Sequence, residues 1–130
     1  MKIVLFDMDG TLTPAREKME IEVLRSLTSL QNKGFEIGIV TGSDMNYLKE
    51  QCEIIFEDFG FDHRKVHYYP CNGTKSFKFK GDKLEKIYET NMIDAIGKEK
   101  YRLLVSACIN IQRHIIETTE CPLTGLFFDY

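Results

Sequence analysis

Long apolar runs, an excess of positive charge and paired cysteines are all missing from this sequence. A membrane-spanning helix needs about 20 consecutive apolar residues, and no stretch of the chain approaches that length. The apolar run Ile3 to Phe6 meets Asp7 too early to form the apolar segment of a signal peptide. The sequence therefore predicts a soluble cytoplasmic protein with no membrane partner.

The missing positive charge excludes a second class of partner. Lysine and arginine number 17 against 20 acidic residues, which gives a net charge of -3, and the lysines are spread along the chain. Such a chain offers no basic surface to hold a nucleic-acid backbone. We therefore expect no nucleic-acid partner.

The cysteines carry no sign of a metal or redox site. They lie far apart, without a CxxC pair or a matching histidine spacing, so neither zinc binding nor a disulfide exchange pair is predicted. We expect all of them to be reduced and mostly to pack against neighbours: Cys52, Cys71, Cys108 and Cys121.

The first 74 residues alternate between strand and helix patterns. The apolar run Lys2 to Phe6 is followed by helical spacing over Glu17 to Lys33, a second strand at Phe35 to Val40, and a further helix after Asp44. This alternation predicts an α/β fold with a parallel sheet, whose ligands gather at the carboxyl ends of the strands. Polar motifs follow both of the first two strands.

The pattern changes near Thr74. Val66 to Tyr69 reads as a third strand that is closed by a turn at Asn72 and Gly73. The segments that follow are antiparallel and helical in character, so we predict two parts, 1–74 and 75–130, the second of α+β type. The segments of this second part are a hairpin of Ser76 to Lys80 and Lys83 to Tyr88, a helix from Lys98 to about Ile115, and a strand at Gly125 to Tyr130.

The most informative stretch is Asp7-Met8-Asp9-Gly10-Thr11. Two acids two residues apart at a strand end face the same way, and their mutual repulsion favours a hard cation such as Mg²⁺ between them. Gly10 permits a sharp turn and a close approach to a bound phosphate. Thr11 and the following leucine do not fit a calcium-binding EF-hand loop. A simple polar turn is the alternative for these residues alone.

Two motifs resemble a known superfamily. Phe6 to Thr13 (FDMDGTLT) and Val40 to Asp44 (VTGSD) resemble the first and second motifs of the haloacid-dehalogenase superfamily. The longer stretches DGTLTPAR, IGIVTGSD and NGT are similar in order and spacing to the eukaryotic-type phosphomannomutase family. The resemblance implies a Rossmannoid parallel-sheet core over 1–74 and a partial α+β cap over 75–130.

The resemblance also implies the roles of the acids. Asp7 would be the catalytic nucleophile that forms an aspartyl-phosphate, and Asp9 the general acid and base. The cofactor would be Mg²⁺, held by the Asp7 carboxylate and the Asp9 backbone carbonyl. The substrate would be a small-molecule sugar phosphate.

Further residues are implied to bind the phosphate and the sugar. Thr41 would donate to a phosphoryl oxygen, together with N–H groups near Gly42 and Ser43, and Gly10 would line the same site. Ser43 as a mere helix cap is the alternative. Arg16 matches a substrate-binding arginine of the family; an exposed arginine at a helix start is its alternative.

Two departures from the family pattern leave the activity open. The superfamily's later lysine and acidic motifs have no counterpart in the sequence, so we expect the chain to end within its cap. The resemblance also implies a homodimer formed through that cap. Thr41 stands where phosphomannomutases usually have glycine, as in sugar-phosphate phosphatases. We expect interconversion of mannose 6-phosphate and mannose 1-phosphate; the alternatives are a sugar-phosphate phosphatase and a non-catalytic remnant that needs a partner chain.

Overall fold

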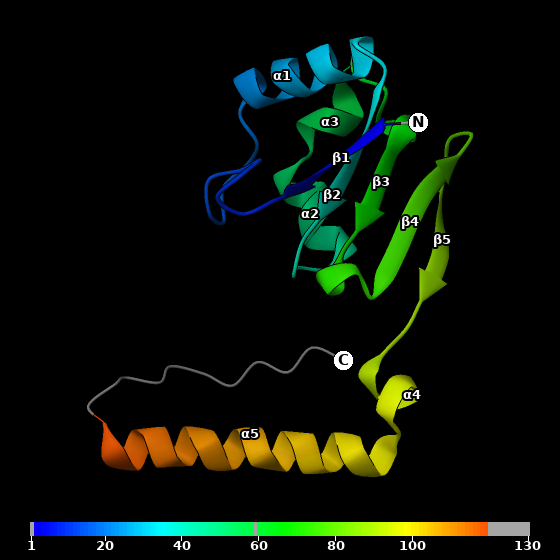
Figure 1. Cartoon of the computed structure of the whole chain (residues 1–130). Coiled ribbons are helices and arrows are strands. Elements are labelled where there is room, and N and C mark those ends of the chain that lie inside the picture. Colours follow the sequence, from blue (N-terminus) through cyan, green and yellow to red (C-terminus); the bar gives the residue numbers. More distant parts are fainter. Residues whose placement is uncertain (1, 59, 120–130) are drawn as a thin grey trace. The chain divides into compact units, whose positions relative to one another are not determined.

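The chain forms two compact units, Met1–Glu89 and Thr90–Tyr130. The computed structural model describes residues 2–58 and 60–119 (Figure 1). The first unit is an α/β domain built on one sheet, which confirms the predicted fold class.

The sheet of the first unit has five strands in the order in which they occur along the chain. The first three pair in parallel, as the alternation of strands and helices predicts, and the last two are antiparallel. The strands are β1 (Lys2–Asp7), β2 (Phe35–Val40), β3 (Val66–Tyr69), β4 (Lys75–Lys80) and β5 (Lys83–Glu89).

The compact units divide after Glu89, and not near Thr74. The reason is that the β4–β5 hairpin continues the sheet: Tyr68 of β3 pairs with Phe77 of β4. Gly81 takes a φ of 60° in the hairpin turn, a conformation that glycine adopts at little cost. The assignment of residues from 75 onward to a cap stays a prediction.

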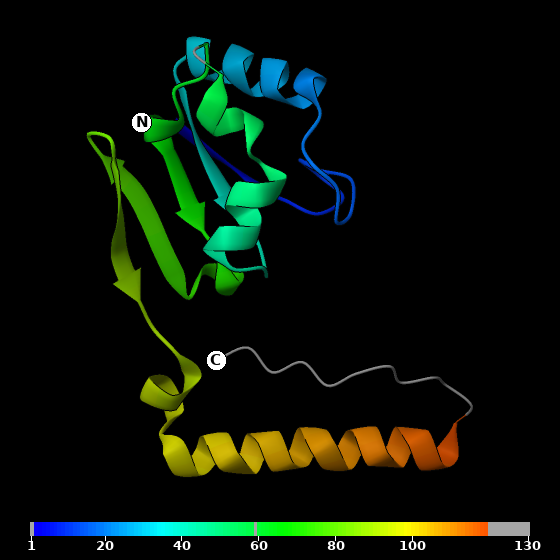
Figure 2. The ribbon, with the colours of Figure 1, turned by 180° about the vertical axis from the view of Figure 1, so that it is seen from behind.

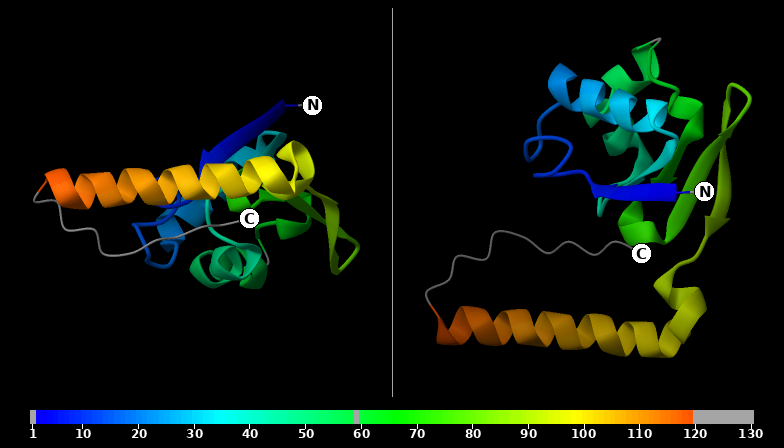
Figure 3. Two further views of the ribbon diagram at one scale, coloured as in Figure 1. Left: turned by 90° about the horizontal axis from the view of Figure 1, so that it is seen from below. Right: turned by 45° about the horizontal axis from the view of Figure 1, so that its top comes forward.

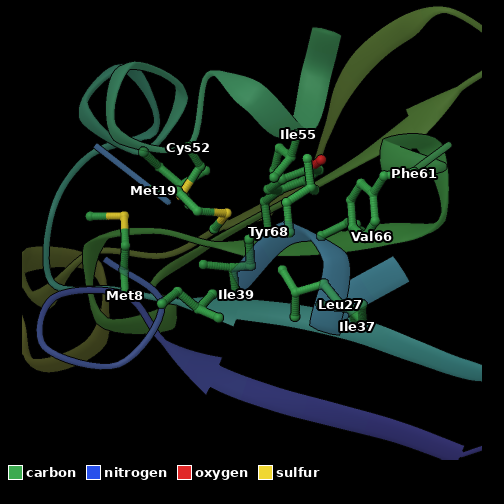
Figure 4. Close-up of a cluster of buried hydrophobic side chains, with 13 residues drawn as sticks. Met8, Met19, Leu27, Ile37, Ile39, Cys52, Ile55, Phe61, Val66 and Tyr68 are labelled. Atoms are coloured by element: carbon green, nitrogen blue, oxygen red, sulfur yellow. The ribbon is translucent and has the colours of Figure 1, made fainter. Parts of the chain in front are cut away.

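Three helices lie on one face of the sheet (Figure 2). They are α1 (Ile21–Asn32), α2 (Met45–Gln51) and α3 (Ile54–Glu57), and two short 3-10 turns, His63–Lys65 and Cys71–Gly73, flank β3. Apolar side chains of the helices and the sheet meet in a buried cluster (Figure 4). Ile37 and Ile39 of β2, and Val66 and Tyr68 of β3, lie within it.

Helix α1 begins later than the helical spacing over Glu17 to Lys33 predicts. Glu20, inside the predicted range, has extended backbone angles (φ -80°, ψ 151°), which a helix interior does not accommodate. The N–H of Met19 donates instead to the carbonyl of Gln51, at 2.7 Å, which ties this segment to the end of α2. The helix therefore starts at Ile21.

The second unit consists of two helices in its described part. Asn91 caps α4 (Met92–Ile96), and Gly97, with a φ of 84°, separates it from α5 (Lys98–Thr118). Figure 3 shows α5 as one unbroken helix, which confirms the predicted helix from Lys98 and extends it. The predicted strand Gly125 to Tyr130 lies outside the described residues. No helix in the described ranges has the length and apolar character that crossing a membrane requires.

Candidate functional site

The carboxyl ends of the three parallel strands bring the two polar motifs to one edge of the sheet. Asp7 ends β1 and is in register with Val40, which ends β2. The N–H of Thr41, the next residue, donates to the carbonyl of Tyr69 at the end of β3, at 3.1 Å. The loops after β1, β2 and β3 therefore start side by side (Figure 1).

Met8 orients the two acids of the first loop. Its side chain is fully buried and lies in the apolar cluster (Figure 4). Its carbonyl accepts hydrogen bonds from the backbone N–H groups of residues 11–13, at 2.9 to 3.2 Å, which close a tight turn. Gly10 takes a φ of 79° in this turn. Asp7 is exposed and Asp9 is half-buried on either side of Met8.

Asp9 also fixes the path of the chain beyond the turn. Its Oδ1 accepts the backbone N–H of Arg16, at 3.2 Å. Arg16 is exposed, as its alternative interpretation expects, but it lies in the loop before α1 and not at a helix start. The Arg16 backbone is thus hydrogen-bonded to the Asp9 side chain.

The negative charge of Asp9 contributes to the raised pKa of two groups, one in α2 and one just beyond it. Burial, and to a lesser extent the Asp9 carboxylate, raises the pKa of the Cys52 thiol to about 12. Cys52 is thus a neutral packing residue, as the sequence predicts. Burial and then Asp9 also raise the pKa of Tyr47, while Arg16 opposes this effect. No feature of the sequence indicated that Tyr47 lies near these two groups.

The second loop combines a buried hydroxyl with a free backbone donor. Thr41 is buried, and its Oγ1 accepts the N–H of Ser43, at 3.1 Å. Gly42 is exposed, and its N–H has no hydrogen-bond partner within residues 2–58 and 60–119. The loop therefore offers the Gly42 N–H and the hydrogen of the Thr41 hydroxyl to a bound anion.

Asp44, and not Ser43, caps the helix that follows. Its Oδ1 accepts the N–H of Tyr47, at 2.8 Å. The alternative in which Ser43 caps α2 is wrong, because Asp44 occupies the N-cap position and its carboxylate is the better acceptor for an N–H donor.

This cap can be tested by substitution. Replacing Asp44 by alanine is expected to lower the free energy of unfolding by about 0.5–2 kcal/mol, because an orphan N–H at the start of α2 loses its acceptor. Asp44→Asn keeps an acceptor oxygen and is expected to lose much less. Urea unfolding of the three proteins measures the difference, and an equal loss in both variants would show that the cap bond is not its source.

A third loop closes over the second. The N–H groups of Asn72 and Cys71 donate to the carbonyls of Thr41 and Ser43, at 2.8 and 2.9 Å. The turn predicted at Asn72 and Gly73 is confirmed as a 3-10 turn. The sequence pattern did not assign Asn72 to the site, although its place directly after the third strand was a signal that could have done so.

The donors present fit a magnesium ion. The described residues contain no group of three His, Cys, Asp or Glu side chains that could enclose a metal. Mg²⁺ does not require one, because it keeps several waters and binds through one or two carboxylates and substrate phosphate oxygens. The exposed Asp7 carboxylate and the Asp9 backbone carbonyl, two residues apart at a strand end, supply oxygen donors of this kind.

The chain is similar to proteins of known activity. It is 33% identical over 131 residues to a phosphomannomutase of Schizosaccharomyces pombe, a match that covers 98% of this chain and 46% of that protein. It is 41% identical over 132 residues to a phosphomannomutase of Encephalitozoon cuniculi, which covers 98% of this chain and 45% of that protein. The chain thus spans about half the length of the curated relatives it matches.

A solved structure shares the fold of this chain. A solved haloacid dehalogenase-like hydrolase from Bacillus subtilis superposes with a TM-score of 0.57 at 21% identity, over 87% of this chain and 34% of that one. The family model of haloacid dehalogenase-like hydrolases matches residues 4–120, which include the loops after β1, β2 and β3. With its two acids and the loop that begins at Thr41 at one sheet edge, the chain belongs to the haloacid dehalogenase-like hydrolase family.

Proposed function

We propose that this chain carries the nucleophile and the phosphate-binding loops of a magnesium-dependent phosphotransferase that interconverts mannose 6-phosphate and mannose 1-phosphate. The observation that supports this most is the register of β1 and β2, which sets Asp7 beside the loop that begins at Thr41. The similarity to phosphomannomutases over 98% of the chain supports the choice of substrate.

Asp7 and Asp9 divide the chemistry between them. A carboxylate oxygen of Asp7 attacks the phosphorus and forms an aspartyl-phosphate, while the bond from phosphorus to the sugar oxygen breaks. Asp9 gives a proton to that leaving oxygen. In the second half, Asp9 takes a proton from the attacking sugar hydroxyl, whose oxygen displaces Asp7 from phosphorus. Mg²⁺, when bound to the Asp7 carboxylate and the Asp9 carbonyl, neutralises charge on the phosphoryl group.

The remaining residues hold the substrate. The Gly42 N–H and the Thr41 hydroxyl donate to the phosphoryl oxygens, and Ser43 orients Thr41 through the bond from its N–H. Gly10 leaves room for the phosphoryl group beside the first loop, because glycine has no side chain. Its φ of 79° is a conformation that glycine adopts readily. Arg16 binds the second, non-reacting end of the sugar phosphate.

A phosphatase is the second candidate, and Thr41 favours it. A hydroxyl at this position is typical of sugar-phosphate phosphatases, in which water and not a sugar hydroxyl receives the phosphoryl group. The same acids serve both reactions, so exclusion of water from the site decides between them.

The products distinguish these functions. The purified chain is incubated with Mg²⁺ and mannose 6-phosphate, and phosphorus NMR follows the sugar phosphates and inorganic phosphate. Mannose 1-phosphate as the main product supports the mutase, and inorganic phosphate supports the phosphatase. If neither product and no phosphoenzyme forms, the chain alone is not a phosphotransferase, and the proposal fails for this chain without a partner.

A further inference from the structure

The loop after β3 has a rare backbone conformation. Cys71, Asn72 and Gly73 have consecutive φ values of 52°, 55° and 76°, all in the left-handed region. Residues other than glycine seldom adopt it, and such a conformation persists only where the surroundings hold it. Here the Thr74 hydroxyl donates to the Cys71 carbonyl, at 2.7 Å, and the Tyr88 hydroxyl donates to the Gly73 carbonyl, at 2.7 Å.

This conformation aligns the third loop with the second. The N–H of Asn72 reaches the Thr41 carbonyl and the N–H of Cys71 reaches the Ser43 carbonyl, so the two bonds bracket Gly42. A side-chain carbon on Gly42 would lie 3.3 Å from Oδ1 and 3.9 Å from Nδ2 of Asn72. The Asn72 carboxamide therefore lies against the open side of Gly42.

Two polar groups without a described partner, the Asn72 carboxamide and the Gly42 N–H, belong to residues that lie in contact. Asn72 is exposed, and its carboxamide, like the Gly42 N–H, has no hydrogen-bond partner in the part of the chain that the structure describes. Rotation of the carboxamide turns its NH₂ group toward Gly42, because the oxygen and nitrogen ends have nearly the same shape. The Thr41 hydroxyl lies one residue away.

We propose that Asn72 is a further phosphate-contacting residue of this site: its Nδ2 donates to a phosphoryl oxygen that the Gly42 N–H also binds. The inference rests on the proposed function and adds a residue to it. Asparagine suits both tasks, because it tolerates the left-handed backbone that joins the loops and carries a donor without negative charge.

Two substitutions separate the carboxamide from the backbone. Asn72→Gly keeps the left-handed conformation and removes the donor. Asn72→Asp keeps the size and the tolerance for this conformation but sets a negative charge beside the phosphate. Asn46→Asp, an exposed position on the neighbouring α2, is the matched control for the added charge.

The test is a titration of the full chain with inorganic phosphate, followed by amide NMR at Gly42 and the Asn72 side chain. The wild-type chain is expected to show saturable shifts at both. Asn72→Gly is expected to bind about tenfold more weakly, the value of one hydrogen bond to a charged acceptor, and Asn72→Asp more weakly still. Asn46→Asp is expected to change the affinity by less than about twofold, because an exposed charge is screened.

The outcomes distinguish this inference from the function on which it rests. If Gly42 does not respond to phosphate in the wild-type chain, the proposed phosphate site is wrong and the role of Asn72 fails with it. If Gly42 responds but folded Asn72→Gly and Asn72→Asp bind phosphate as the wild type does, the site stands and Asn72 only shapes the turn. If Asn72→Gly does not fold, the Asn72→Asp titration decides alone.

Discussion

Replacing Asp7 by asparagine is expected to abolish the phosphoenzyme and to lower phosphoryl transfer by about a thousandfold or more. An amide is a far weaker nucleophile than a carboxylate, and loss of a covalent nucleophile has effects of at least this size. The wild-type chain and the variant are incubated with Mg²⁺ and mannose 6-phosphate that is radiolabelled on its phosphorus. The reactions are then quenched in acid. The label that stays on the protein is then measured, together with its release by alkali.

The loss should not come from unfolding. Asp7 is exposed at the end of β1, and its replacement removes one of the two negative charges of the Asp7 and Asp9 pair. The free energy of unfolding is therefore expected to change by less than about 0.5 kcal/mol. Asp82→Asn, in the exposed turn between β4 and β5, makes the same chemical change away from the site and is expected to label normally. A labelled Asp7→Asn protein would mean that another residue is the nucleophile.

The strands were predictable where an apolar run ends at polar segments on both sides. Phe35–Val40 and Val66–Tyr69 have the predicted bounds, because each is a short apolar run between polar segments. The start of α1 was missed, since the helical spacing continues back to Glu17 while a tertiary hydrogen bond from Met19 to Gln51 holds the backbone away from a helix. Local pattern cannot report a bond across 32 residues of chain.

The compact units divide after Glu89, away from the change of pattern near Thr74, for a similar reason. The change of pattern near Thr74 is real, because pairing becomes antiparallel there. A change of strand direction does not end a sheet, however, and the pairing of Tyr68 with Phe77 keeps the hairpin in the first unit.

The candidate site shows the same limit at the level of single residues. The sequence indicated the residues that a motif names, and the parallel register sets Asp7 beside the Thr41 loop as the rule for strand ends predicts. It chose Ser43 over Asp44 as the alternative cap, although both are good capping residues. It left out Asn72, whose place depends on how two loops meet and not on either loop alone.

Stability of the first unit depends on the face of the sheet that the helices cover. Ile39 is fully buried on β2, in register with Phe6 of β1 and Tyr68 of β3. Ile39→Ala is expected to lower the free energy of unfolding by about 2–5 kcal/mol, because it removes buried apolar contacts and leaves a cavity. Urea unfolding, followed by circular dichroism, measures the loss.

Ile87 offers the matched control, since it is also an isoleucine on a strand of the same sheet but is 56% exposed. Ile87→Ala is expected to cost less than about 1 kcal/mol, most of it from strand propensity. Because domains of this kind are stable by only about 5–15 kcal/mol, the Ile39 variant should lose a large part of its stability while the Ile87 variant keeps nearly all of it. Equal losses would contradict the burial of Ile39, and with it the packing that holds the carboxyl ends of β1 and β2 together.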